Sequence, residues 1–177
     1  MAHATTTKPM RLSPILARPL AATPLPLVRA ATRLVFARVL ERHPNLFDRL
    51  GAEARKRFAF IPTDLPFAFL VQPARRVISV HRKRTPVLAD ATATGPILLL
   101  LALLEGRIDG DAVFFSRDLT VSGDMEAILA LRNALDDCGF DLPRDLGASA
   151  GPLGPLVTRA ATHIRDRALA GGDRAWS

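Results

Sequence analysis

Residues 87–135 read VLADATATGPILLLLALLEGRIDGDAVFFSRDLTVSGDMEAILALRNAL and decide the fold. Apolar and polar side chains alternate over residues 87–94, with Val87, Ala89, Ala91 and Ala93 on one face. This period of two predicts a half-buried strand. The Gly-Pro pair at 95–96 ends the strand, and because proline is tolerated in a first helical turn, a helix is expected from Pro96 to about Glu105.

The expected helix is apolar on every side between residues 97 and 104. It therefore has no solvent face, and something apolar must surround it. The run is far shorter than the roughly 20 residues that span a bilayer. The surroundings are then the protein's own core, a membrane surface or a bound apolar molecule.

The second half of the stretch predicts another strand and another helix. Residues 117–122 alternate again, and Asp124 is placed to accept hydrogen bonds from the first free amide groups of a helix. One side of this helix is broadly apolar. That side consists of Met125, Ile128, Leu129, Leu131, Leu135 and Cys138. The whole unit is strand, apolar helix, turn, strand and amphipathic helix.

Patterns before this unit add three strands and two helices. Residues 27–42 and 45–57 have helical periodicity, whereas residues 58–61, 67–72 and 77–81 suit short strands. Tight connections favour antiparallel pairing. The expected fold is α/β (α+β): a sheet of about five mainly antiparallel strands, covered by helices on one face.

Length and composition favour one soluble domain with extensions. The chain has 177 residues, of which 49% are hydrophobic and 23% charged. A single cysteine, Cys138, excludes an internal disulfide and suits a reducing, cytoplasmic compartment. We divide the chain into a flexible, proline-rich basic segment (1–26), the main domain (27–140), and a linker with a C-terminal amphipathic helix (141–177).

The net charge of +7 is concentrated near the N-terminus, where no acidic residue precedes Glu41. Such a block is attracted to anionic surfaces, so we expect contact with the inner membrane. The candidate contact residues are Lys8, Arg11, Arg18, Arg29 and Arg33. Two alternatives remain open: a composition that only keeps the protein soluble, and an organellar transit peptide.

Motifs for catalysis are weak. Residues 147–151 spell G-x-S-x-G around Ser149. A nucleophile elbow requires a strand directly before this motif and a helix directly after it. Here no strand is expected before the motif, and Pro152 follows it. Glu105, Asp109 and Asp111 suit a turn and caps better than a metal site. We expect no catalytic residue, no metal and no cofactor.

Nucleic-acid binding is not expected either. Basic clusters occur at residues 55–57, 75–76 and 82–84, but the chain has no tyrosine, and the phenylalanines occupy core-like positions. Recognition of single strands needs aromatic side chains beside the charge. These clusters are interpreted as solvated faces or as a membrane or partner surface.

The order of these elements resembles the sterol carrier protein type two domain. The likeness rests on ADATATG (89–95), the leucine helix, GRID (106–109), VFF (113–115) and LTVSGDME (119–126), and covers roughly residues 87–136. It implies an α/β lipid-binding fold with an apolar tunnel between sheet and helices. The expected lining is Phe67, Phe69, Leu98, Leu101, Phe114, Phe115, Leu119, Val121, Ile128, Leu131 and Leu135. A filled core without ligand is the alternative.

Residues 13–26, the basic helix after them and DLPF (64–67) are similar to the bacterial accessory factors of ubiquinone biosynthesis that carry this domain. That resemblance implies a non-catalytic protein of the oxygen-independent branch. It would bind the polyprenyl tail of quinone precursors, or phospholipid, while ubiquinone-biosynthesis enzymes act on the head group. The alternatives are a general lipid carrier, or an interaction module whose apolar groove holds a partner protein.

Overall fold

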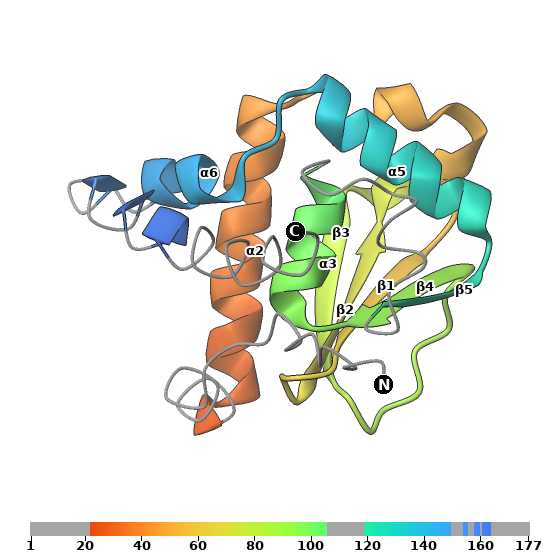
Figure 1. The fold of residues 1–177 in the computed structure, drawn as a ribbon, viewed down its shortest axis with the longest axis horizontal. Coiled ribbons are helices and arrows are strands. Elements are labelled where there is room, and N and C mark those ends of the chain that lie inside the picture. The colour runs from red at the N-terminus through yellow and green to blue at the C-terminus, as the bar shows by residue number, and fades with distance from the viewer. Residues whose placement is uncertain (1–21, 106–118, 150–153, 156–157, 160, 164–177) are drawn as a thin grey trace, which may run out of the picture.

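The computed structural model describes residues 22–105, 119–149, 154–155, 158–159 and 161–163. Its centre is a five-stranded sheet in the order β3-β2-β1-β4-β5 (Figure 1). The strands are β1 (Phe58–Pro62), β2 (Phe67–Gln72), β3 (Val77–Arg82), β4 (Ala91–Gly95) and β5 (Thr120–Gly123). Only β1 and β4 pair in parallel, and the other three pairs are antiparallel. The expected fold class is confirmed.

Three α-helices pack against the sheet. These are α2 (Leu25–Arg42) beside β3, α3 (Ile97–Leu104) over β1 and β4, and α5 (Met125–Asp137) over β4. A fourth helix, α6 (Leu142–Ser149), packs against α2 (Figure 1). Two 3-10 segments, η1 (Asp48–Arg55) and η2 (Pro73–Arg75), complete the described elements.

Aspartate side chains accept hydrogen bonds at the starts of the two central helices. The carboxylate of Asp64, in the β1–β2 loop, accepts a hydrogen bond of 3.0 Å from the Ile97 amide at the start of α3. Asp124 is the N-cap of α5, and its Oδ1 accepts from the Ala127 amide at 3.0 Å. The predicted role of Asp124 is confirmed.

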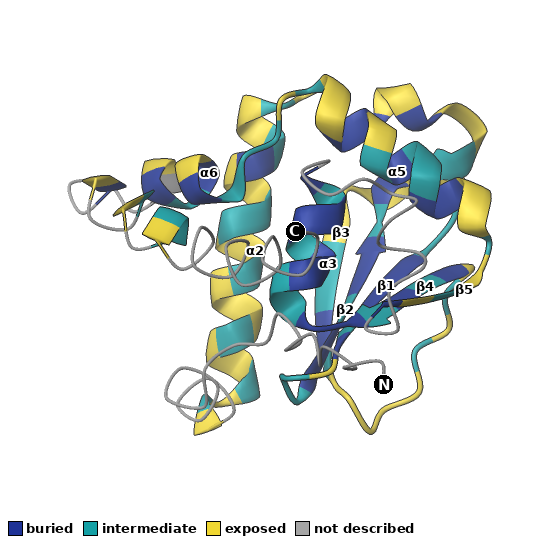
Figure 2. Ribbon diagram, in the orientation of Figure 1, coloured by how far each residue is buried: buried dark blue, intermediate teal, exposed yellow. Residues whose placement is uncertain are grey.

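The core lies between the helices and the facing side of the sheet (Figure 2). Phe58 is fully buried on that side of the sheet, and Leu100 and Leu103 of α3 meet Ile128 and Leu131 of α5 in the same cluster. Small side chains at Ala91 and Ala93 of β4 let α3 and α5 approach the sheet closely, which explains why the alternating face carries alanines.

Two predicted boundaries were wrong for physical reasons. The strand expected from residue 87 begins at Ala91, and Leu88 is exposed. The chain is instead tied down at Asp90, which accepts from the Arg57 amide at 2.7 Å. The helix expected over residues 45–57 is the 3-10 segment η1, which is broken at Gly51, where φ is 53°.

The linker expected after Cys138 contains α6, which the proline and glycine residues of that segment did not suggest. Of the expected C-terminal helix, residues 158–159 and 161–163 are helical. Lys8, Arg11, Arg18, Asp109, Asp111, Phe114 and Phe115 lie outside the described residues.

Candidate functional site

An apolar cavity of about 360 Å³ lies between α2, the sheet and α3. Its volume falls within the range of roughly 300–1,000 Å³ that is typical of small-molecule sites. The walls are built from six parts of the chain. From α2 come Ala31, Thr32, Val35, Phe36 and Val39; from the turn before η1, Leu46 and Phe47; from the sheet, Phe60, Phe69, Val71 and Ile78; from α3, Ile97, Leu100, Leu101 and Leu104; from α5, Leu131 and Leu135; and beyond α5, Phe140 and Leu142.

The all-apolar surface of α3 is explained by its two neighbours. Leu99 and Leu103 are buried in the core, whereas Leu101 and Leu104 are half-buried and line the cavity. A helix between a core and a cavity has no face for water. The leucine-rich helix α3 therefore lies between the core and the cavity.

Four of the predicted lining residues share this cavity: Phe69, Leu101, Leu131 and Leu135. Five others are described but do not line it: Phe67, Leu98, Leu119, Val121 and Ile128. Phe67 is buried at the end of β2, with the Arg82 guanidinium 5.1 Å from its ring centroid. Ile128 and Leu119 are buried in the core.

The inner face of α2 and the residues around Phe140 belong to the wall but were not predicted to do so. The apolar stripe of α2 was visible in the sequence, but periodicity cannot distinguish a face against a cavity from one against a filled core. Phe140 was the last residue of the expected main domain, and Leu142 was assigned to the linker. No sequence signal pointed to them beyond their own hydrophobicity.

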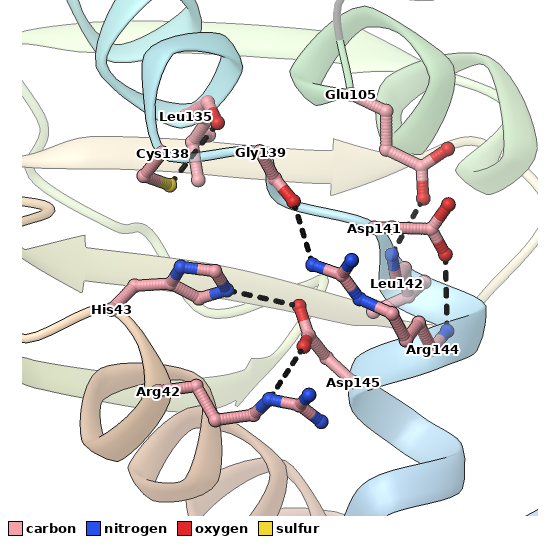
Figure 3. Close-up of polar contacts among 10 residues, drawn as sticks. All are labelled: Arg42, His43, Glu105, Leu135, Cys138, Gly139, Asp141, Leu142, Arg144 and Asp145. Atoms are coloured by element: carbon pink, nitrogen blue, oxygen red, sulfur yellow. Dashed lines mark hydrogen bonds and ion pairs between the residues drawn. The ribbon is translucent and has the colours of Figure 1, made fainter.

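Charge is kept out of the cavity. Thr32 is the one polar side chain among the lining residues. Glu105 follows the lining residue Leu104, and its Oε1 accepts from the amide of Leu142, another lining residue, at 2.9 Å (Figure 3). An unpaired polar group would be costly to bury in such a site, so the cavity is chemically suited to a hydrocarbon.

Two of the candidate membrane-contact residues, Arg29 and Arg33, are described, and they differ in their contacts. Arg29 donates from Nε to the Val80 carbonyl at 2.9 Å, across the edge strand β3. Arg33 is exposed on α2, near the exposed Leu34. Thus Arg29 ties α2 to the sheet, while Arg33 remains accessible to an anionic surface.

Cys138 and the residues before Ser149 lie within the described ranges. Burial raises the pKa of the Cys138 thiol, and its Sγ donates to the Leu135 carbonyl (Figure 3). The residues around Ser149 are preceded by the rest of α6 and not by a strand. Within the described ranges, no group of three His, Cys, Asp or Glu side chains could hold a metal ion. No described helix is long and apolar enough to cross a membrane.

Comparisons with solved structures show a similar fold. A solved structure described as "UbiJ-SCP2 Ubiquinone synthesis protein" has a TM-score of 0.54 and 22% identity, covering 67% of this chain and 98% of its own. The sterol carrier protein domain 2 of Helicoverpa armigera has a TM-score of 0.40 and 16% identity, covering 54% and 75%. No curated protein sequence matches significantly.

The model of the SCP-2 sterol transfer family matches residues 36–136, which is more than half of the chain. The match includes all five strands of the sheet, α3, and almost all of α5. The chain therefore belongs to the SCP-2 sterol transfer family.

Proposed function

We propose that this protein is a non-catalytic lipid-binding accessory factor of ubiquinone biosynthesis. Its cavity would hold the polyprenyl tail of quinone precursors while partner enzymes act on the head group. The observation that carries the proposal is the cavity of about 360 Å³, whose walls are apolar except for Thr32. Phospholipid is a second cargo of the same chemistry, and a general lipid carrier is the corresponding alternative.

The energetics of such a cargo support this role. Each methylene group exposed to water costs about 0.8 kcal/mol, so a tail of several isoprene units is confined to membranes or protein cavities. An apolar cavity lets enzymes outside the bilayer reach the head group. The choice of quinone precursors draws on the fold likeness to the ubiquinone synthesis protein.

Lipid extraction of the purified full chain, followed by mass spectrometry, tests the cargo. We expect co-purifying prenylated quinone precursors in preference to other lipids. Phospholipid alone would favour the general carrier. Recovery of no lipid, together with a stable protein partner, would contradict the proposal and support the interaction module.

The oxygen-independent branch is part of the same proposal and has its own test. Deletion of the gene should lower ubiquinone in cells grown without oxygen, and re-expression should restore it. An equal loss in aerated cells would remove the assignment to that branch.

The outer side of α2 is the candidate contact with an anionic membrane surface. Leu27 is 61% exposed and Leu34 54% exposed, beside the exposed Arg33. Exposed apolar side chains flanked by arginine suit the boundary between head groups and acyl chains. Co-sedimentation should be stronger with vesicles containing phosphatidylglycerol than with pure phosphatidylcholine, and Arg33→Glu should weaken it. Equal binding to both vesicles would contradict a contact driven by charge.

A further inference from the structure

The segment that joins α5 to α6 forms one wall of the cavity. Phe140 and Leu142 both line it, and Leu142 is the first residue of α6. The neighbouring lining residues Val39, Leu46 and Phe47 are buried or nearly so, whereas Ala31, farther along α2, is exposed. The cavity therefore has a more buried end near Phe140 and Leu142 and a more exposed end near Ala31.

Two buried carboxylates hold this end wall in place (Figure 3). Glu105 and Asp145 are the buried acidic side chains among the described residues. Glu105, at the end of α3, accepts from the Leu142 amide at 2.9 Å. Asp145, in α6, lies 3.4 Å from Arg42 Nε and 3.5 Å from His43 Nε2, both at the end of α2.

Shorter-range contacts fix the start and the far side of α6. Asp141 Oδ1 accepts from the Arg144 amide at 3.0 Å, and Arg144 donates to the Gly139 carbonyl at 3.1 Å (Figure 3). Gly147 approaches Thr158 so closely that a methyl group would not fit there. A buried charge is tolerated only where it is paired, so breaking these contacts would free the wall without filling the cavity.

The cavity is small compared with a polyprenyl tail. Taking ~30 Å³ for each heavy atom, the share of one water molecule in the liquid, the cavity accommodates about a dozen carbon atoms. That corresponds to between two and three isoprene units. A longer tail must then emerge at the more exposed end.

We propose that the wall of Phe140 and Leu142, positioned by Glu105 and Asp145, limits how many isoprene units of a tail the cavity encloses. This inference rests on the proposed function, because it assumes a prenyl cargo. It assigns Phe140 and Leu142 as specificity-determining residues, and Glu105 and Asp145 as positioning residues that act through them.

Binding of a prenyl alcohol series tests the limit. Geraniol, farnesol, geranylgeraniol and longer homologues would displace a fluorescent apolar probe from the full chain. For the wild type we expect affinity to rise at least about tenfold from geraniol to farnesol, and then to level off. The double variant Phe140→Ala/Leu142→Ala removes more carbon atoms than one isoprene unit contains. Its affinity should therefore continue to increase from farnesol to geranylgeraniol before it levels off. Leu98→Ala, in α3 but outside the wall, is the matched control and should keep the wild-type profile.

Asp145→Asn distinguishes positioning from a purely structural role. If Asp145 positions the wall, the chain length at which affinity levels off should increase, whatever happens to the thermal midpoint. A lower midpoint with an unchanged length profile would contradict that assignment.

The outcomes separate the two proposals. A wild type that binds prenyl alcohols with a length limit that the double variant does not move would overturn this inference alone. Affinity that rises through the longest homologue in the wild type would do the same. A wild type that binds none of the alcohols would contradict the proposed function and this inference together.

Discussion

At the scale of single residues, Asp124 has two roles that determine how the stability of the fold depends on pH. Its carboxylate caps α5 and also pairs with the Lys56 ammonium group, which contacts Glu53 at 2.6 Å. The hydrogen bond from Lys56, followed by that from the Ala127 amide, lowers the pKa of Asp124. The same pairing raises the pKa of Lys56.

The sign of this shift predicts acid sensitivity. Because the pKa is lower in the folded state, the stabilisation is fully present above the unfolded value of about 3.9 and is lost as the pH falls through the folded value. In Asp124→Asn, which keeps a capping oxygen, the free energy of unfolding should depend less on pH below about pH 4. Asp124→Ala should lose stability at neutral pH as well. Urea unfolding of the three proteins across this pH range measures both effects, and parallel pH profiles for wild type and Asp124→Asn would exclude the pairing.

Leu101 and Ile128 were both expected to line the lipid tunnel, but the structure predicts different effects for an aspartate substitution at each position. Leu101 is half-buried in the cavity wall, whereas Ile128 is fully buried in the core. Leu101→Asp should fold and lose bound lipid, because a carboxylate at the wall repels hydrocarbon. Ile128→Asp should cost several kcal/mol, enough to unfold much of the protein, because its charge has no partner in the core.

Circular-dichroism melting and lipid mass spectrometry on the same preparations distinguish these two results. Leu88→Asp, at a leucine that is 76% exposed, is the matched control and should change neither. A folded Leu101→Asp variant that still carries lipid would exclude the cavity as the lipid site.

At the scale of elements, the sequence predicted those parts whose signals are local. Pro96 and Asp124 mark the starts of α3 and α5. The strand β2 was also predicted, but it is buried on both faces, since Phe67 and Ala68 are both buried. The segment η1 was mistaken for an α-helix because its apolar spacing is helical, and that spacing does not reveal the break at Gly51, where φ is 53°. Similarly, α6 depends on Asp145 reaching Arg42, a contact between residues far apart in the chain.

The junction of β5 and α5 depends on one glycine. Gly123 has φ of 80°, and a Cβ atom there would lie 2.3 Å from the Asp90 carbonyl oxygen, which accepts from the Asp124 amide. Gly123→Ala should therefore cost more than the roughly 1–2 kcal/mol of left-handed strain alone. Gly139, with φ of 65° and open space around it, is the matched control, and Gly139→Ala should cost only that strain. Equal losses in chemical denaturation would exclude the close approach as the cause.

At the scale of the whole molecule, the cavity could not be delimited from the sequence. Its walls come from α2, the turn before η1, the sheet, α3, α5 and the residues after α5. Hydrophobicity identifies an apolar side chain, but only the tertiary arrangement decides whether it faces filled core or empty space. This is why the cavity wall includes Leu101 and Leu135 but not Leu98, although all three are leucines on helices.

A cargo bound in the apolar cavity would add contacts to the folded state. A ligand that binds only the folded state stabilises it by about 2.7 kcal/mol at a hundred times its dissociation constant. For a chain of this size, that corresponds to a rise in the thermal midpoint of very roughly 5–10 °C. We expect farnesol to produce such a rise in delipidated wild type and in Leu88→Asp, but not in Leu101→Asp. Differential scanning calorimetry measures the shift, and the decisive comparison is between the two aspartate variants. An equal rise in both would mean that farnesol stabilises the protein from somewhere other than this cavity.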